Sequence, residues 1–165
     1  MNLPAGAAER EESGGISSAY IHATTLAIGE AGILIRGPSG AGKSRLALEL
    51  IAEASRRRLF ARLVGDDRVA IEARGGRLIA RGHPAIAGQI ESRGEGIVDQ
   101  AYESSVVVRL VLDLGGAAAP SPPRLPLPDA HTSLKGVLLP QLSLDGPGSQ
   151  QAGIVIGHLL RMGNG

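Results

Sequence analysis

Residues 33–44 read Ile33-Leu34-Ile35-Arg36-Gly37-Pro38-Ser39-Gly40-Ala41-Gly42-Lys43-Ser44, an apolar run that ends in a glycine-rich loop. The last eight residues match the pattern G-x-x-x-x-G-K-[ST], in which the glycines let several backbone N–H groups converge on a phosphate. The lysine of this pattern reaches the outer phosphates, and the hydroxyl that follows can bind Mg²⁺. The sequence therefore predicts a polyphosphate-binding loop.

The residues on either side of the loop support this prediction. Ile33–Ile35 is typical of a buried strand, and apolar residues after Ser44 recur with the period of a helix that runs to about Arg57. The positive end of that helix would lie at the phosphates. Of the 17 lysine and arginine residues only Lys43 and Lys135 are lysines, and Lys43 stands where a compact ammonium is wanted. We expect ATP and Mg²⁺ here, with the nucleotide bound by Gly37, Pro38, Ser39, Gly40, Ala41, Gly42, Lys43 and Ser44.

The remaining pattern is rich in strands. Further strands are expected at 17–28, 59–64, 69–74, 77–81, 105–114 and 137–144, a short helix at 85–90, and a strand or helix at 154–160. Residues 115–128 hold many prolines and are expected to form a connector. We expect a disordered tail at 1–15 and one α/β domain at 16–165, with a mixed sheet and the loop helix on one face.

Composition excludes several functions. Aromatic residues make up 2% of the chain, which argues against stacking platforms for single-stranded nucleic acid. A net charge of +1 gives no broad field for duplex DNA or anionic lipid. There is no cysteine, no signal peptide and no membrane-length apolar run, so a cytoplasmic protein is expected.

Two further segments carry charges that suit phosphoryl transfer. Asp66 and Asp67 close the predicted strand 59–64, and a strand beside the loop strand is expected to deliver such carboxylates to metal and γ-phosphate. The alternative is an ordinary Gly-Asp-Asp turn. Residues 90–99 alternate charges with glycines and, on composition alone, equally fit a solvated turn with a surface ion pair.

Taken together, these motifs resemble the HPr serine kinase/phosphorylase family. That family has a histidine before the loop, then G-x-S-G-x-G-K-S, A-L-E-L, an Asp-Asp pair and the signature I-E-x-R-G-x-G-I-[IV]-[ND]. In this chain they correspond to His22, Gly37–Ser44, Ala47–Leu50, Asp66-Asp67 and Ile90–Asp99, in the same order. The resemblance covers roughly residues 20–115 and implies a fold like that of HPr kinase and PEP carboxykinase.

The resemblance also implies roles for single residues. Lys43 and the loop would hold ATP or pyrophosphate, while Ser44 and Glu91 would hold Mg²⁺. Asp67, together with Asp66, would accept the proton of a target serine. His22 and Arg93 would lie around the phosphates, and a downstream catalytic arginine has its nearest match in Arg124. The implied partner is the phosphocarrier protein HPr or a paralogue, and a homo-oligomer is compatible with the family.

Departures from the family pattern modify these expectations. The chain is expected to be a truncated form that lacks the family's N-terminal domain, and the family's C-terminal helices, which help to bind the partner, are expected to be cut short at Gly165. The family's basic Pro-Gly-Arg-Asn loop, which is tied to dephosphorylation, is replaced by Asp145-Gly146-Pro147-Gly148-Ser149-Gln150. Kinase chemistry is therefore expected more than phosphorylase chemistry. Two other functions stay open, namely a small-molecule kinase and a non-catalytic ATP-sensing module.

Overall fold

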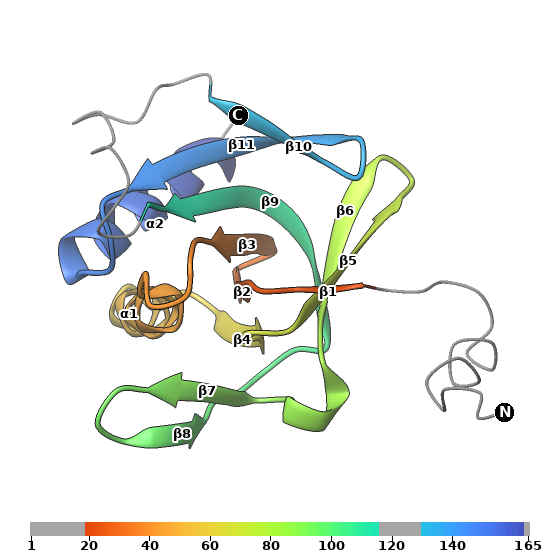
Figure 1. The fold of residues 1–165 in the computed structure, drawn as a ribbon. Helices are drawn as coiled ribbons and strands as arrows, with labels where there is room; N and C mark the ends of the chain where they lie inside the picture. The colour runs from red at the N-terminus through yellow and green to blue at the C-terminus, as the bar shows by residue number, and fades with distance from the viewer. Residues whose placement is uncertain (1–18, 116–129, 164–165) are drawn as a thin grey trace, which may run out of the picture.

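The computed structural model describes residues 19–115 and 130–163. Within them a nine-stranded mixed sheet is strongly curved, two helices lie on one face of its central strands, and a separate two-stranded sheet lies beside it (Figure 1). The predicted tail at 1–15 and Arg124 lie outside the described residues. The elements are β1 (Tyr20–Ile21), β2 (Thr24–Ile28), β3 (Ala31–Arg36), α1 (Lys43–Arg56), β4 (Ala61–Gly65), β5 (Val69–Arg74), β6 (Arg77–Gly82), the 3-10 turn η1 (Pro84–Ile86), β7 (Gln89–Ser92), β8 (Gly96–Asp99), β9 (Ser105–Leu114), β10 (His131–Leu134), β11 (Val137–Leu144) and α2 (Ser149–Gly163).

The order of the strands brings several chain segments to one edge of the sheet. The path is β1-β5-β6-β9-β3-β2-β4, and the β10–β11 hairpin joins the end of β9. Strand β3 is parallel to β9, and β9 is parallel to β11. Strand β2 is antiparallel to both β3 and β4, so β4 points the same way as β3. The C-terminal ends of β3, β4, β9 and β11 therefore share an edge.

Most of the predicted elements are confirmed, and the strand-rich α/β class is correct. The predicted helix after the glycine-rich loop is α1, and the ambiguous segment at 154–160 belongs to helix α2. Gly75 and Gly76, with φ of +58° and +76°, form the tight turn between β5 and β6.

Two predictions need correction. The expected helix at 85–90 is the short turn η1, and Ile90 lies instead in β7, because its side chain is buried in the core from an extended segment. Strand β4, which ends at Gly65 directly before Asp66, does not lie beside the loop strand β3 either. Strand β2 lies between β3 and β4, since both pair with it in antiparallel fashion.

The core has two parts, one on each face of the sheet. On the helix face, Leu46 and Leu50 of α1 and Ile156 of α2 pack against Ile33 and Ile35 of β3. On the opposite face, Leu34 of β3 packs with residues such as Leu78, Val111 and Leu139. Alternate residues of β3 thus point to opposite faces, as the pleat of a strand requires. The rigid sheet fixes where the chain leaves β3.

Candidate functional site

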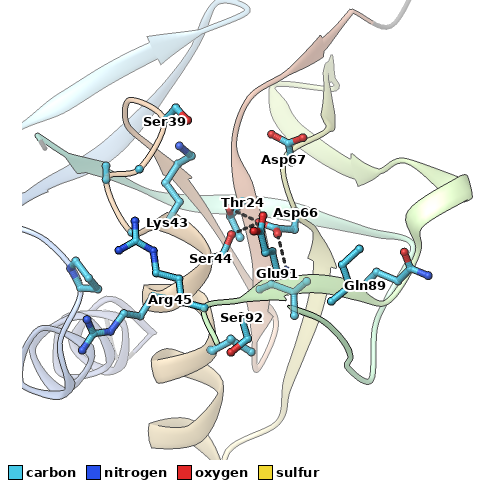
Figure 2. A pocket seen from close by; sticks show the side chains of 18 of the residues that line it. Thr24, Ser39, Lys43, Ser44, Arg45, Asp66, Asp67, Gln89, Glu91 and Ser92 are labelled. Carbon is cyan, nitrogen blue, oxygen red and sulfur yellow. Dashed lines mark hydrogen bonds between the residues drawn. The ribbon is translucent and has the colours of Figure 1, made fainter. Parts of the chain in front are cut away.

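A pocket of about 770 Å³ lies at the shared edge of the sheet. Its walls come from the loop between β3 and α1, from the end of β4, and from the β7–β8 hairpin (Figure 2). The lining includes Gly40, Lys43 and Ser44, both Asp66 and Asp67, and Glu91 and Arg93 of the hairpin. The structure thus brings together most of the residues that the sequence singles out, and a volume of this size suits a small-molecule ligand.

The loop Gly37–Gly42, called the glycine loop below, turns the chain from the end of β3 into α1. Gly40 and Gly42 have φ of +81° and +98°, conformations that side-chain-bearing residues rarely adopt. Helix α1 begins at Lys43, and the Lys43 Nζ donates to the carbonyl oxygens of Gly37 at 2.9 Å and Pro38 at 3.1 Å. The ammonium is therefore held within the concave side of the loop, beside the free N–H groups of the helix start.

Gly42 is also packed against the segment that follows β11. A Cβ built on Gly42 would lie 2.7 Å from the Pro147 ring, and Pro147 itself lines the pocket. The next residue, Gly148, donates its backbone N–H to Glu49 of α1. The altered loop 145–150 therefore forms a wall against the end of the glycine loop, a contribution that the sequence alone did not indicate.

Replacing Gly42 by alanine is expected to destabilise the fold more than replacing Gly40 by alanine. Both changes force a side chain into a positive-φ position, which costs roughly 1–2 kcal/mol. Gly42→Ala also overlaps Pro147, whereas no described residue lies within 4 Å of a Cβ at Gly40, and overpacking adds about 1–3 kcal/mol. Urea unfolding of both variants measures the difference. Equal losses would contradict a rigid Pro147 wall.

Asp66 is the best-connected carboxylate of the site. It is 7% exposed, and its Oδ1 accepts from the Ser44 hydroxyl at 2.7 Å and the Thr24 hydroxyl at 2.8 Å. The Glu91 backbone N–H donates to Oδ2 at 3.3 Å, so the three bonds converge from three elements (Figure 2). Asp66 thereby fixes both the first turn of α1 and the β7–β8 hairpin. Thr24 was missed because nothing in its local sequence marks it.

Asp67 also lines the pocket but is far more exposed than Asp66. Its side chain is 70% exposed, it lines the pocket, and its φ of +67° turns it away from the direction of Asp66. The Asp67 Oδ1 lies 3.1 Å from Nδ1 of His22, whose ring is itself exposed. His22, which sequence alone left ambiguous, therefore contacts the site through Asp67. An exposed carboxylate beside an imidazole can accept a proton from a bound hydroxyl.

The residues predicted to hold Mg²⁺ fit it in part. Ser44 and Glu91 both line the pocket, and the buried Asp66 lies directly behind the Ser44 hydroxyl. Within residues 19–115 and 130–163 no three histidine or carboxylate side chains form a ready metal cluster. Mg²⁺ commonly uses one or two carboxylates and completes its shell with phosphate oxygens and water. The donor set suits an ion that arrives with a polyphosphate.

Several pocket-lining residues have no role predicted from the sequence. Arg45 and Leu48 of α1 and Gln89 and Ser92 of β7 also line it. Arg45 pairs with Glu49 one turn later, at 3.1 Å. Lys135, the second lysine, lies far along the chain in the β10–β11 turn with φ of +51°, and is not among the pocket residues.

Residues 16–155 match the family model of the HPr serine kinase C-terminal domain. The chain belongs to this family. Curated HPr kinase/phosphorylases include one from Mycoplasma mycoides that is 42% identical over 47% of this chain and 23% of its own length. One from Clostridium beijerinckii is 43% identical over 48% of this chain and 24% of its own length.

A solved member of the HPr kinase family shares the fold. The Hpr(Ser) kinase/phosphatase from Coxiella burnetii superposes with a TM-score of 0.67 and 26% sequence identity, over 87% of this chain and 98% of that one. The curated relatives are much longer, and this chain matches about a quarter of their length. Among the described residues no helix is long and apolar enough to cross a bilayer.

Proposed function

We propose that the chain transfers the γ-phosphoryl group of ATP to a serine hydroxyl of HPr or a paralogous phosphocarrier in the cytoplasm. The observation that carries this proposal is the position of Asp67. Its exposed carboxylate lines the same pocket as Lys43 and Ser44, so the candidate base and the candidate phosphate-binding residues face the same pocket. Membership of the HPr kinase family supports the reaction and the partner.

Binding of ATP follows from the loop. The N–H groups of the glycine loop and of the first turn of α1 would surround the β-phosphate, with Lys43 on the β- and γ-phosphates. Ser44 and Glu91 would hold Mg²⁺, which when bound neutralises charge on the transferring phosphoryl group. Asp66 orients the Ser44 hydroxyl, and Arg93 adds a cation to the pocket wall.

The transfer step needs a serine hydroxyl in line with the γ-phosphate. Asp67 would take the proton of that hydroxyl as its oxygen forms a bond to phosphorus and the bond from phosphorus to the β,γ-bridging oxygen breaks, leaving ADP. The His22 ring, 3.1 Å from Asp67, would orient the carboxylate for this task. Arg124 is retained as the candidate downstream arginine.

The direct test is incubation of the chain with Mg-ATP and purified HPr, read by intact mass. We expect one added phosphate on HPr, and none on HPr whose target serine is replaced by alanine. ATP binding without transfer to any phosphocarrier would favour the alternative of a nucleotide-sensing module. A strong reverse reaction from phospho-HPr and inorganic phosphate would contradict the expectation drawn from the arginine-free loop 145–150.

Replacing Ser44 by alanine is expected to weaken the magnesium dependence of ATP binding. The hydroxyl that is held by Asp66 at 2.7 Å is the proposed metal ligand, so its loss should cut the Mg²⁺-induced gain in affinity by about tenfold or more. Calorimetric titrations of ATP with and without Mg²⁺ give this ratio. Ser39→Ala, which changes another pocket-lining serine, is the matched control and should leave the ratio intact.

A further inference from the structure

A bidentate ion pair joins the last residue of β3 to the parallel strand β9. Arg36 donates from Nε to Oδ1 of Asp113 at 2.7 Å and from Nη2 to Oδ2 at 2.8 Å. The Gln141 side chain of β11 also donates to Oδ2 of Asp113. Both charged side chains are about 30% exposed, at 30% and 28%. One carboxylate therefore ties three strands together at the edge that carries the site.

This cluster does not touch the pocket. Arg36, Asp113 and Gln141 are absent from the pocket lining, and the alternation along the strands places them on the face opposite α1. Leu34 and Val111, two residues before Arg36 and Asp113, belong to the core of that opposite face. Direct contact with a ligand in the pocket is therefore not the reason for the cluster.

Stability is a weak explanation as well. Desolvation of a half-buried ion pair offsets much of its attraction, and apolar pairs of similar volume often serve a fold equally well. What the guanidinium fork supplies is geometry, because two parallel hydrogen bonds fix both the distance and the plane of the partners. The position of the cluster, directly before the glycine loop, indicates that it fixes the start of that loop.

The glycine loop begins at the residue after Arg36. A Cβ on Gly37 would lie 2.6 Å from the carbonyl oxygen of Leu114, the residue after Asp113, so the loop start is packed directly on β9. The Gly37 carbonyl in turn accepts the Lys43 ammonium at 2.9 Å. A shift of Arg36 relative to Asp113 is thus transmitted through Gly37 to Lys43.

We infer that Asp113 is a positioning residue for polyphosphate binding, acting through Arg36 to set where the glycine loop leaves the sheet. The inference rests on the proposed ATP-binding function and adds residues that lie outside the motifs of the loop. Gln141 extends the same control to β11, whose far end leads to Pro147 at the other end of the loop. The start of the glycine loop is thus held against β9, and its end is held against the segment that follows β11.

Three variants separate geometry from stability and from charge. Asp113→Asn removes the charge at constant shape. The double variant Arg36→Met/Asp113→Leu replaces the pair by apolar side chains. It still tests the role of the pair in Mg-ATP binding if Asp113→Asn fails to fold. Arg36→Lys keeps a cation but lacks the planar fork. Glu53→Gln breaks an ion pair with Arg57 at the far end of α1 and is the matched control.

Calorimetry with Mg-ATP and steady-state transfer to HPr supply the readouts, alongside thermal unfolding. We expect all three cluster variants to weaken Mg-ATP binding by about tenfold or more, since small displacements of binding groups are costly. The KM for ATP should rise while kcat at saturating ATP and the melting temperature of the double variant stay near those of the parent. Glu53→Gln should bind as the parent does.

Parent-like affinity for Mg-ATP in the double variant would overturn the inference. Parent-like affinity in Arg36→Lys would overturn it too, because a positive charge alone would then be sufficient. A fall in kcat with an unchanged KM would also overturn it. Failure of the parent chain to bind Mg-ATP is a different result, because it removes the proposed function and with it this inference, whatever the variants do.

Discussion

Replacing Lys43 by methionine is expected to weaken Mg-ATP binding severely and, with it, phosphate transfer. Each hydrogen bond to a charged group contributes roughly 1.5–3 kcal/mol, so the loss of contacts to two phosphates corresponds to about a hundredfold or more in affinity. The fold should survive, because within the part of the chain that the structure describes Lys43 donates only to the carbonyls of Gly37 and Pro38. Isothermal titration with Mg-ATP and with Mg-pyrophosphate measures the effect.

The second lysine gives this experiment a matched control. Lys135 lies in the β10–β11 turn with φ of +51°, and asparagine tolerates such a conformation, so Lys135→Asn removes one positive charge with little strain. It should bind Mg-ATP like the parent chain. Equal losses in both variants would mean that net charge rather than a built ammonium site governs binding. Undiminished binding by Lys43→Met would remove the loop from the proposed function.

Replacing Asp67 by asparagine is expected to lower the rate of phosphate transfer by about 10²–10⁴-fold while sparing ATP affinity. Removal of a general base has a cost of this order, and an amide cannot accept the serine proton. Asp67 is exposed and contacts His22, whereas the Ser44 hydroxyl and the Glu91 backbone N–H donate to Asp66. The polyphosphate grip should therefore remain intact.

Single-turnover transfer to HPr, read by intact mass, together with calorimetry of Mg-ATP, separates the two quantities. Glu103→Gln, a change at an exposed carboxylate outside the pocket lining, is the control for lost negative charge. A parallel loss of binding and transfer in Asp67→Asn would assign Asp67 to the nucleotide rather than to the acceptor. Full activity would exclude it as the base.

The local part of the site could be predicted from sequence because its parts are adjacent in the chain. Strand β3, the glycine loop and α1 follow one another within residues 31–56, and their residue types and periodicity are self-consistent. The fold class followed from the same pattern of short apolar runs. Family resemblance added the Ile90–Asp99 signature, which composition alone could not distinguish from a solvated turn.

The rest depends on contacts between distant segments. Thr24 meets Asp66 across 42 residues, and Arg36 meets Asp113 across 77, so no local window contains either pair. The insertion of β2 between β3 and β4 is likewise a matter of strand order, which propensity does not specify. The sequence wrongly predicts a helix at residue 90, because a single apolar residue after a proline fits the period of a helix and that of a strand equally well.

The β7–β8 ribbon has a consequence for how the pocket is completed. A two-stranded ribbon is marginal by itself, and this one is secured to the body through the burial of Ile90, the partial burial of Val98 and the bond from Glu91 to Asp66. Glu91 and Arg93 are therefore expected to move into or out of the pocket wall together. If Glu91 holds Mg²⁺ as proposed, a substitution that loosens Ile90 from the core is expected to lower the fraction of molecules with a complete site, without altering any residue of the proposed chemistry.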